Sequence, residues 1–369
     1  MLWVRAIWWA VCQSGLGEVE KQMGKQLTPR KEAILRSLVE EYIRTATPVA
    51  SEQLQRQYGL PWGAATIRNE MASLEEEGLL FQPHTSAGRM PTDLGYRYFV
   101  EHLMVESALS LDEQRQIRHQ FYQVQHQLDE WVRLTASVLS RALQSAAVVT
   151  PPRAAQGRLK HFEVLSLQDV VALLVVVLQD GAVKQERLLL LSPLTQEELS
   201  QSSQRLNRLL VDLNAEELEE RIAGLDLDAN ERLVVGAVGR MLSQHGEYTA
   251  ETFYHDGILQ MLDQPEFTTL GPEHERNQRI RKVVEVLEQN KLLPALAAQV
   301  PAGGVQVIIG GESEFEAMKD VSLVVSRYGR EGQVGGLLGI VGPTRMQYSR
   351  AVAVVRYMTE VMNDLLAEL

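Results

Sequence analysis

Cysteine is almost missing from this 369-residue chain, which has a single one, Cys12. One thiol cannot build an internal disulfide framework, and it makes a cysteine-based zinc site implausible. Because chains without disulfides are typical of reducing compartments, the composition favours a cytosolic (cytoplasmic) protein. Long apolar runs are missing too. The longest unbroken one, residues 170–178, is far shorter than the ~20 residues that a membrane helix needs.

Positive charge is in short supply. The chain has 36 Lys and Arg against 48 Asp and Glu, which gives a formal net charge of -12. This balance argues against a protein that coats nucleic acid or anionic membranes without selectivity. It leaves open site-specific DNA binding by a small local surface.

Catalytic and cofactor-binding motifs are also missing. The glycine-rich segment 330–345 lacks the G-x-x-x-x-G-K-[ST] spacing of a phosphate-binding loop, and no G-x-G-x-x-G opens a helix after a strand. We interpret this segment as a tight hairpin that leads into a strand. His119 and His126 share one side of a predicted helix, but no third or fourth ligand is evident. We therefore expect no enzyme activity, no cofactor and no metal site.

The first 26 residues differ from the rest of the chain. An early arginine and an apolar stretch, residues 6–12, resemble a weak signal peptide, but no cleavage site comes after them. We expect residues 1–26 to be a disordered extension, or upstream sequence read in frame ahead of a true start at Met23.

Three short helices are predicted after this extension. Thr28 can cap a helix with Pro29 at its first position, and apolar residues then recur at helical spacing. Ser51 can cap a second helix, which Gly59 ends in a left-handed conformation. A third helix covers about residues 64–77. Short helices with a tight turn between the second and third predict a helix-turn-helix.

The third helix has two different sides. Ile67, Met71 and Leu74 share one side at 100° per residue and are predicted to be buried. The other side carries small or amide-bearing residues, namely Ala65, Asn69, Ala72 and Ser73, with Thr66 and Arg68 on its flanks. Such a surface can approach DNA closely, and Arg and Asn can make bidentate contacts to guanine and adenine edges. The alternative is an ordinary solvated helix face.

Charge does not decide between these two interpretations. Residues 27–104 contain eight Lys or Arg and ten Asp or Glu, so the local charge is 8 − 10 = −2. This is a weak electrostatic footprint for a DNA-binding domain. The interpretation therefore depends on the segment after the third helix.

A wing is predicted directly after the third helix. A short strand, residues 79–82, leads into an acid-free loop and then into a helix capped by Thr92. A helix-turn-helix with a hairpin after it is a winged helix, whose wing lies along the DNA backbone or enters the minor groove. The candidate wing contacts are His84, Thr85, Ser86 and Arg89.

The rest of the chain mixes helices and strands. Residues 110–143 predict one amphipathic helix with a heptad seam, which we interpret as packed on its own domain's sheet; the alternative is a helix that helps to join two subunits. Strands are predicted over 161–167, 170–178 and 182–191, then about 80 helical residues, then strands over 304–311, 321–329 and 335–343 and a final helix. A sheet that begins before the helices and is completed after them suggests an inserted helical domain.

Several motifs resemble one known family. "PVASEQL", "ATIRNEMASLEEEGLL", "PHTSAGRMPTDLGYRYFVEHL" and "LLGIVGPTRMQYSRAV" are similar to the heat-inducible transcription repressors, the HrcA family, from about Leu27 to the last helix. Three positions depart from the family pattern. Gly63 and Ala64 stand where serines are common, which removes the usual hydroxyl cap of the third helix. Ala50 stands where glycine is usual.

The resemblance implies an α+β protein of three domains. These are a winged-helix DNA-binding domain over 27–106, a discontinuous GAF-like domain over 107–194 and 276–369, and an inserted, mainly helical dimerisation domain over 195–275. It also implies a homodimer that represses chaperone operons from an inverted-repeat operator in double-stranded DNA, with activity that depends on the GroEL chaperonin.

The leading hypothesis combines the residues and the resemblance. Arg68 and Asn69 are expected to contact base edges, with Thr66 and Ser73 in support, and the wing is expected to contact phosphate or the minor groove. The alternative is a regulator whose GAF-like domain binds a small molecule and thereby controls DNA binding.

Overall fold

The computed structural model describes residues 27–85, 87–124, 128–154, 157–245, 253–269, 272–289, 300, 304–312, 319, 321–329 and 334–368. The extension expected over residues 1–26 lies outside these ranges. The chain divides into two compact units. The first comprises Met1–Thr150, Phe253–Arg327 and Leu337–Leu369, and the second comprises Pro151–Thr252 and Tyr328–Gly336.

The first unit contains the winged helix and a larger sheet. Its helical segments are α2 (Pro29–Thr45), α3 (Ser51–Tyr58), α4 (Ala64–Glu76), α5 (Asp93–Tyr98), η2 (Phe99–Leu103), α6 (Leu111–Gln123), α7 (Leu128–Leu143), α11 (Ile258–Leu262), α12 (Pro265–Thr268), α13 (Glu273–Gln289), η4 (Gly310–Glu312) and α15 (Tyr348–Ala367). Its strands are β1 (Leu80–Phe81), β2 (Met90–Pro91), β3 (Ala146–Val149), β8 (Tyr254–Asp256) and β9 (Val305–Ile309), with most of β10 (Val321–Gly329) and β11 (Val334–Pro343).

The winged helix forms as the sequence predicts. Thr28 caps α2 by accepting a hydrogen bond from the amide of Lys31, and Gly59 ends α3 in the left-handed conformation with φ +58°. The buried faces of α2 and α4 meet in a small core of Ile34, Leu35, Leu38, Ile67, Met71 and Leu74. β1 and β2 pair antiparallel and carry the wing between them. The α+β fold class is therefore confirmed.

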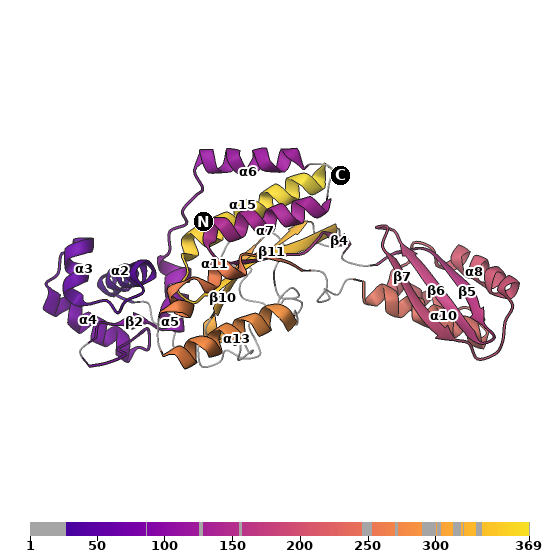
Figure 1. Cartoon of the computed structure of the whole chain (residues 1–369), viewed down its shortest axis with the longest axis horizontal. Helices are drawn as coiled ribbons and strands as arrows, with labels where there is room; N and C mark the ends of the chain where they lie inside the picture. The colour runs from indigo at the N-terminus through magenta and orange to yellow at the C-terminus, as the bar shows by residue number, and fades with distance from the viewer. Residues whose placement is uncertain are drawn as a thin grey trace. The chain divides into compact units, whose positions relative to one another are not determined.

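The larger sheet of the first unit has the order β8-β3-β11-β10-β9. α7 and α15 pack against each other (Figure 1), and α7 also packs on β3 and β8. Gly339 lets β11 approach β10 closely, because a Cβ there would lie 2.5 Å from the carbonyl oxygen of Val324. The predicted strands at β9, β10 and β11 are confirmed. The short strands β3 and β8 were not predicted, because three or four residues carry too little alternation to be recognised.

The single helix expected over residues 110–143 is wrong. The structure has two helices, α6 and α7, because the backbone leaves helical geometry at Val124 with φ −113° and ψ 14°. Trp131 in the first turn of α7 donates its indole N–H to the carbonyl of Val124 at 2.9 Å, which ties the start of α7 to the end of α6. Trp131 and Thr135 are buried in their own unit, as the preferred interpretation of this segment expects.

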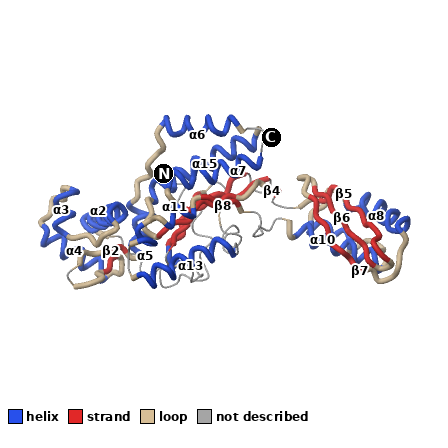
Figure 2. The backbone as a smooth tube through the Cα atoms, in the orientation of Figure 1, coloured by secondary structure: helices blue, strands red, loops and turns tan. Residues whose placement is uncertain are grey.

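The second unit has its own sheet and its own core. β5 (Leu159–Gln168), β6 (Val171–Leu178) and β7 (Val183–Leu189) form a three-stranded antiparallel sheet, with α8 (Gln196–Leu210), α9 (Ala215–Ile222) and α10 (Ala229–Ser243) beside it (Figure 2). The short strand β4 (Arg153–Ala154) pairs with the start of β11. The turn between β6 and β7 contains Gly181 at φ +86°, as the Asp-Gly signal predicts.

The expected boundaries of the insertion need correction. Residues 107–194 were assigned to the GAF-like domain and 195–275 to a mainly helical insertion, but strands β5 to β7 belong to the second unit. The physical reason is their core, because Phe162, Leu174 and Val176 pack in one cluster with Leu206 and Val238 of the helices. Residues 253–275, which were assigned to the insertion, lie in the first unit with β8, α11 and α12.

Among the residues described, no helix combines the length and the apolarity that crossing a bilayer requires. His126 of the histidine pair lies outside the described residues, and His119 lies on α6 next to Gln123. In the described parts of the chain, no group of three or more His, Cys, Asp or Glu is placed to hold a metal ion.

Candidate nucleic-acid interface

Helix α4 presents a narrow polar strip to solvent. Its apolar side is fixed in the core, since Ile67 and Leu74 are fully buried. The side chains of Ala65, Arg68 and Asn69 are exposed, and Thr66 is half-buried at the edge of the strip. The structure therefore brings together three of the four residues predicted on this helix.

The N-terminal end of α4 carries no acidic side chain. Its N-cap is Gly63, which supplies no side-chain hydrogen bond, and the first turn contains neither Asp nor Glu. The first amide N–H groups of a helix have no partner within it and carry the positive end of the helix dipole. This end of α4 therefore favours an anionic ligand such as DNA phosphate.

Arg68 is held by a solvated ion pair. Its Nη2 lies 3.0 Å from Oε1 of Glu52 on α3, and the two side chains are 66% and 51% exposed. The amide of Glu52 itself, at the start of α3, holds the pKa of the Glu52 carboxyl below its usual value, with Arg68 contributing. An exposed pair of this kind contributes little to stability, because water screens both charges. Arg68 can therefore leave Glu52 for a base edge at small cost.

Ser73 does not belong to the exposed strip. Its Oγ accepts a hydrogen bond from Nζ of Lys31 at 2.8 Å, and the same ammonium group lies 2.8 Å from Glu77. Both contacts tie α4 to the start of α2. The structure thus gives Ser73 a role in packing two helices together and places it apart from Arg68 and Asn69.

The side chain of Gln82 bonds the backbone of the wing at two points. Nε2 of Gln82 donates to the carbonyl of Ala87 at 2.7 Å and to that of Thr85 at 3.2 Å. His84 and Thr85 are exposed at the tip, as expected for residues that contact phosphate. Ser86 lies outside the described residues.

Arg89 lies at the base of the wing and has a partner there. Its Nε donates to Oε2 of Glu75 at 2.9 Å, and its side chain is only 13% exposed. Its backbone forms a two-way antiparallel bridge with Val49, with both N–H to O distances at 2.9 Å. The expected wing contact is thus directed toward the last turn of α4, away from the tip.

A groove of about 430 Å³ separates the start of α3 from the wing and is bordered by α4. The residues that line it are Val49, Ala50, Ser51, Glu52, Arg68, Met71, Gln82, Thr85, Ala87, Gly88 and Arg89. The helix strip and the wing are therefore two sides of one concave surface, which suits a curved, phosphate-lined ligand such as a DNA strand.

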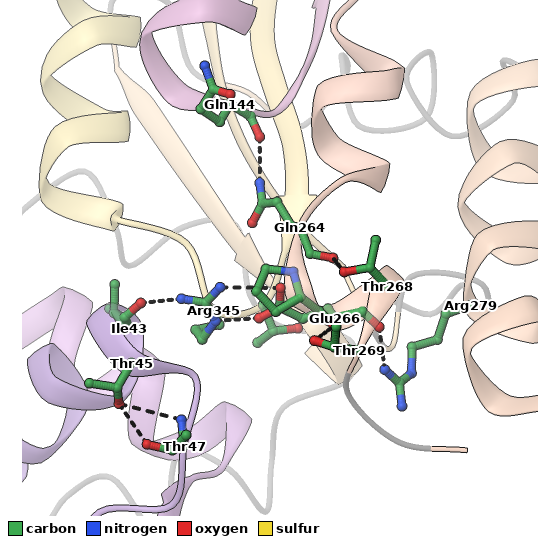
Figure 3. A network of polar contacts seen from close by, with 12 residues as sticks. Ile43, Thr45, Thr47, Gln144, Gln264, Glu266, Thr268, Thr269, Arg279 and Arg345 are labelled. Carbon is green, nitrogen blue, oxygen red and sulfur yellow. Dashed lines mark hydrogen bonds and ion pairs between the residues drawn. The ribbon is translucent and has the colours of Figure 1, made fainter. Parts of the chain in front are cut away.

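A polar network holds the far end of α2 (Figure 3). Arg345, in the loop before α15, donates to the carbonyl of Ile43 in the last turn of α2 and forms an ion pair with Glu266 of α12. Arg279 of α13 donates to the carbonyl of Glu266 at 2.7 Å. A cation at a helix C-terminus is electrostatically favourable. Sequence patterns did not identify this contact, because its partners are some 300 residues apart along the chain.

Comparison with known sequences identifies relatives along almost the whole chain. The family described as HrcA protein C terminal domain matches residues 129–352. The heat-inducible transcription repressor HrcA of Roseiflexus castenholzii is 46% identical, over 94% of this chain and 96% of that protein. The proteins of the same name from Chloroflexus aurantiacus and Dehalococcoides mccartyi are 45% and 42% identical, over 94% and 93% of this chain and 96% and 97% of theirs.

One solved structure shares the fold. The crystal structure of a hypothetical protein superposes with a TM-score of 0.54 and 23% sequence identity, over 93% of this chain and 98% of that chain. At this level of identity the likeness concerns the fold alone.

Proposed function

Since the chain belongs to the HrcA family of heat-inducible transcription repressors and is a repressor of heat-shock genes, we propose that it acts as a homodimer on an inverted-repeat operator. Each protomer places the N-terminal half of α4 in the major groove. Arg68 and Asn69 contact base edges, with Thr66 beside them. The wing residues His84, Thr85 and Ser86 contact the phosphate backbone or the minor groove.

The observation that carries this proposal is the acid-free strip of α4 next to the wing. Asp and Glu are common in this chain, yet the exposed residues Ala65, Arg68 and Asn69 form a surface without a carboxylate. The nearest acid, Glu52, already pairs with Arg68, and a hydrogen-bond acceptor on a base can take its place as the partner of Arg68. Because the winged helix has a small net negative charge, most of its attraction to DNA must come from these few groups.

The second unit supports the homodimer. Its helices cover one face of the sheet. The opposite face carries seven apolar residues, Leu165, Val171, Leu173, Val175, Val177, Val183 and Leu189, together with Glu163, Gln185 and Arg187. Val183 and Leu189 are 64% and 67% exposed. An exposed apolar sheet face of this kind is typical of a protein–protein interface.

The two edges of this sheet differ. At the outer edge of β5, the side chain of Asn207 on α8 bonds the amide and carbonyl of Phe162 at 3.0 and 2.7 Å, which blocks strand addition. β7 lies at the other edge, and its Val183 and Leu189 are on the open face of the sheet. We place the dimer contact on the open face and the β7 edge, where a second copy covers both.

Dependence on the GroEL chaperonin is part of the proposal and is supported by the family resemblance. The test compares operator affinity at several temperatures with and without purified chaperonin. Affinity that rises when chaperonin is added supports this part. If operator affinity changes with temperature and is the same with and without chaperonin, the heat response belongs to the repressor itself.

The DNA-binding proposal is tested with a promoter fragment from a chaperone gene and a scrambled fragment of equal length. The native chain should prefer the promoter fragment, and Asn69→Ala should reduce that preference while leaving affinity for scrambled DNA unchanged. Equal binding of both fragments by the native chain would refute the proposal.

A further inference from the structure

The base of the wing is where three elements of the winged helix meet. Arg89, the residue before β2, contacts the last turn of α4 through its side chain and the segment before α3 through its backbone. Val49 in that segment is fully buried, so the backbone bridge is anchored to the core. The wing therefore has a fixed attachment at Arg89.

The neighbouring residue shows how close this attachment is. A Cβ on Gly88 would lie 2.4 Å from the carbonyl carbon and oxygen of Val49 and 2.7 Å from the carbonyl carbon of Pro48. Such distances leave room for glycine alone. The backbone of the wing at Gly88 therefore lies directly against the backbone of Pro48 and Val49, which lead into α3.

The guanidinium of Arg89 is poorly placed to be a phosphate ligand. It is 13% exposed and bonded to Glu75, which is itself 34% exposed. Moving the guanidinium to a phosphate would leave the Glu75 carboxylate unpaired beside the negatively charged DNA backbone. Like charges at short range are destabilising in a partly buried setting.

We propose that Glu75 and Arg89 are a positioning pair, which fixes the wing against the recognition helix α4 and acts on DNA affinity through the geometry of the wing. The carboxylate of Glu75 is then required for tight binding, although it is an acid close to DNA. This inference rests on the proposed DNA-binding function, because the pair has no such role in a chain that binds no operator.

The direction in which one substitution changes the affinity for DNA tests the inference. Glu75→Gln removes a negative charge near DNA, so electrostatics alone predicts tighter binding. A positioning role predicts weaker binding, by about tenfold, the order expected when one charge-assisted hydrogen bond is lost. The matched control is Glu76→Gln, which removes the same charge from the adjacent exposed residue and should leave affinity unchanged or slightly raise it.

Two further variants separate positioning from direct contact. Glu75→Asp keeps the charge but shortens the reach, and it should weaken binding much as Glu75→Gln does. Arg89→Gln should weaken binding to a similar extent and leave the slope of log K against log salt unchanged. In the double variant, it should weaken binding little beyond the effect of Glu75→Gln alone. A phosphate ligand would instead lower that slope by about one per subunit when removed.

The measurement is fluorescence anisotropy on the promoter fragment at several salt concentrations, with thermal unfolding as a check of folding. Tighter binding by Glu75→Gln, or a lower salt slope in Arg89→Gln, would overturn the inference while leaving the DNA-binding function standing. Absence of promoter preference in the native chain would instead overturn the proposed function.

Discussion

Arg68 and Asn69 illustrate what a single sequence reveals at the scale of residues. Their exposure is a consequence of the 100° periodicity of α4, which also buries Ile67. The partners of Ser73 and Arg89 could not be predicted in this way. Ser73 meets a lysine 42 positions earlier and Arg89 meets a glutamate 14 positions earlier, and both contacts depend on how α2 and the wing pack on α4.

Arg68→Ala should remove discrimination between DNA sequences and leave the protein folded. A good bidentate contact to a base is worth about 1–3 kcal/mol of discrimination, and the lost ion pair with Glu52 is solvated and contributes little. The measurement is the ratio of affinities for promoter and scrambled DNA. Arg115→Ala is the control, since Arg115 is a 77% exposed arginine on α6. An unchanged ratio in Arg68→Ala would remove this residue from the interface.

At the scale of elements, a buried carboxylate joins α2 to α3. Glu41 is 1% exposed and accepts hydrogen bonds from Arg44 at 2.7 Å, from Gln53, and from the hydroxyl of Tyr58 at 3.3 Å. Burial acts to raise the pKa of Glu41, but the hydrogen bonds from Arg44 and Gln53 outweigh it, so that the pKa lies below 4.5. Burial raises the pKa of Tyr58 to about 12, and the negative charge of Glu41 is the second cause of this shift.

Glu41→Gln should destabilise the winged helix at neutral pH by about 1–2 kcal/mol, since it removes charge-assisted hydrogen bonds. A carboxyl with a lowered folded pKa contributes stability above its unfolded pKa, and that contribution is lost as pH falls below about 4.5. The difference in thermal midpoint between native and Glu41→Gln proteins should therefore shrink as the pH is lowered below 4.5. A difference that stays constant down to pH 3 would contradict this assignment.

The strands of the second unit could be predicted from sequence, but the sheet to which they belong could not. The continuous apolar run of β6 and the Asp-Gly turn after it predict the hairpin, but they carry no information about which sheet the hairpin joins. Membership is decided by the packing of Phe162 and Val176 in one cluster with Leu206 of α8 and Val238 of α10, which lie 30 to 76 positions further along the chain. The insertion was therefore assigned too few strands.

At the scale of the whole molecule, the proposed recognition of an inverted-repeat operator needs two copies of the chain. A palindromic operator is matched by the two-fold symmetry of a dimer. The exposed apolar face of β5, β6 and β7 supplies a surface that a second copy can cover. The fold class and the repression of heat-shock genes were both predicted from sequence, because the motifs that resemble the family are local and distinctive.

Leu189→Glu should shift the chain toward the monomer, because it places a charge in the apolar face at the β7 edge. Burying an unpaired carboxylate in an interface costs several kcal/mol. The measurement is molar mass by light scattering across a concentration series. Leu259→Glu is the matched control, because Leu259 is 76% exposed on α11 in the other unit. A dimer that survives Leu189→Glu unchanged would place the interface elsewhere.

The central claim is that the chain reads an inverted repeat in DNA as a dimer through α4 and the wing. Selection of bound sequences from a random pool of double-stranded DNA tests it most directly. We predict recovery of an inverted repeat by the native chain, with half-sites about one helical turn or a multiple of it apart, and loss of the consensus with Arg68→Ala. Recovery of unrelated sequences, or of a single half-site without symmetry, would contradict it.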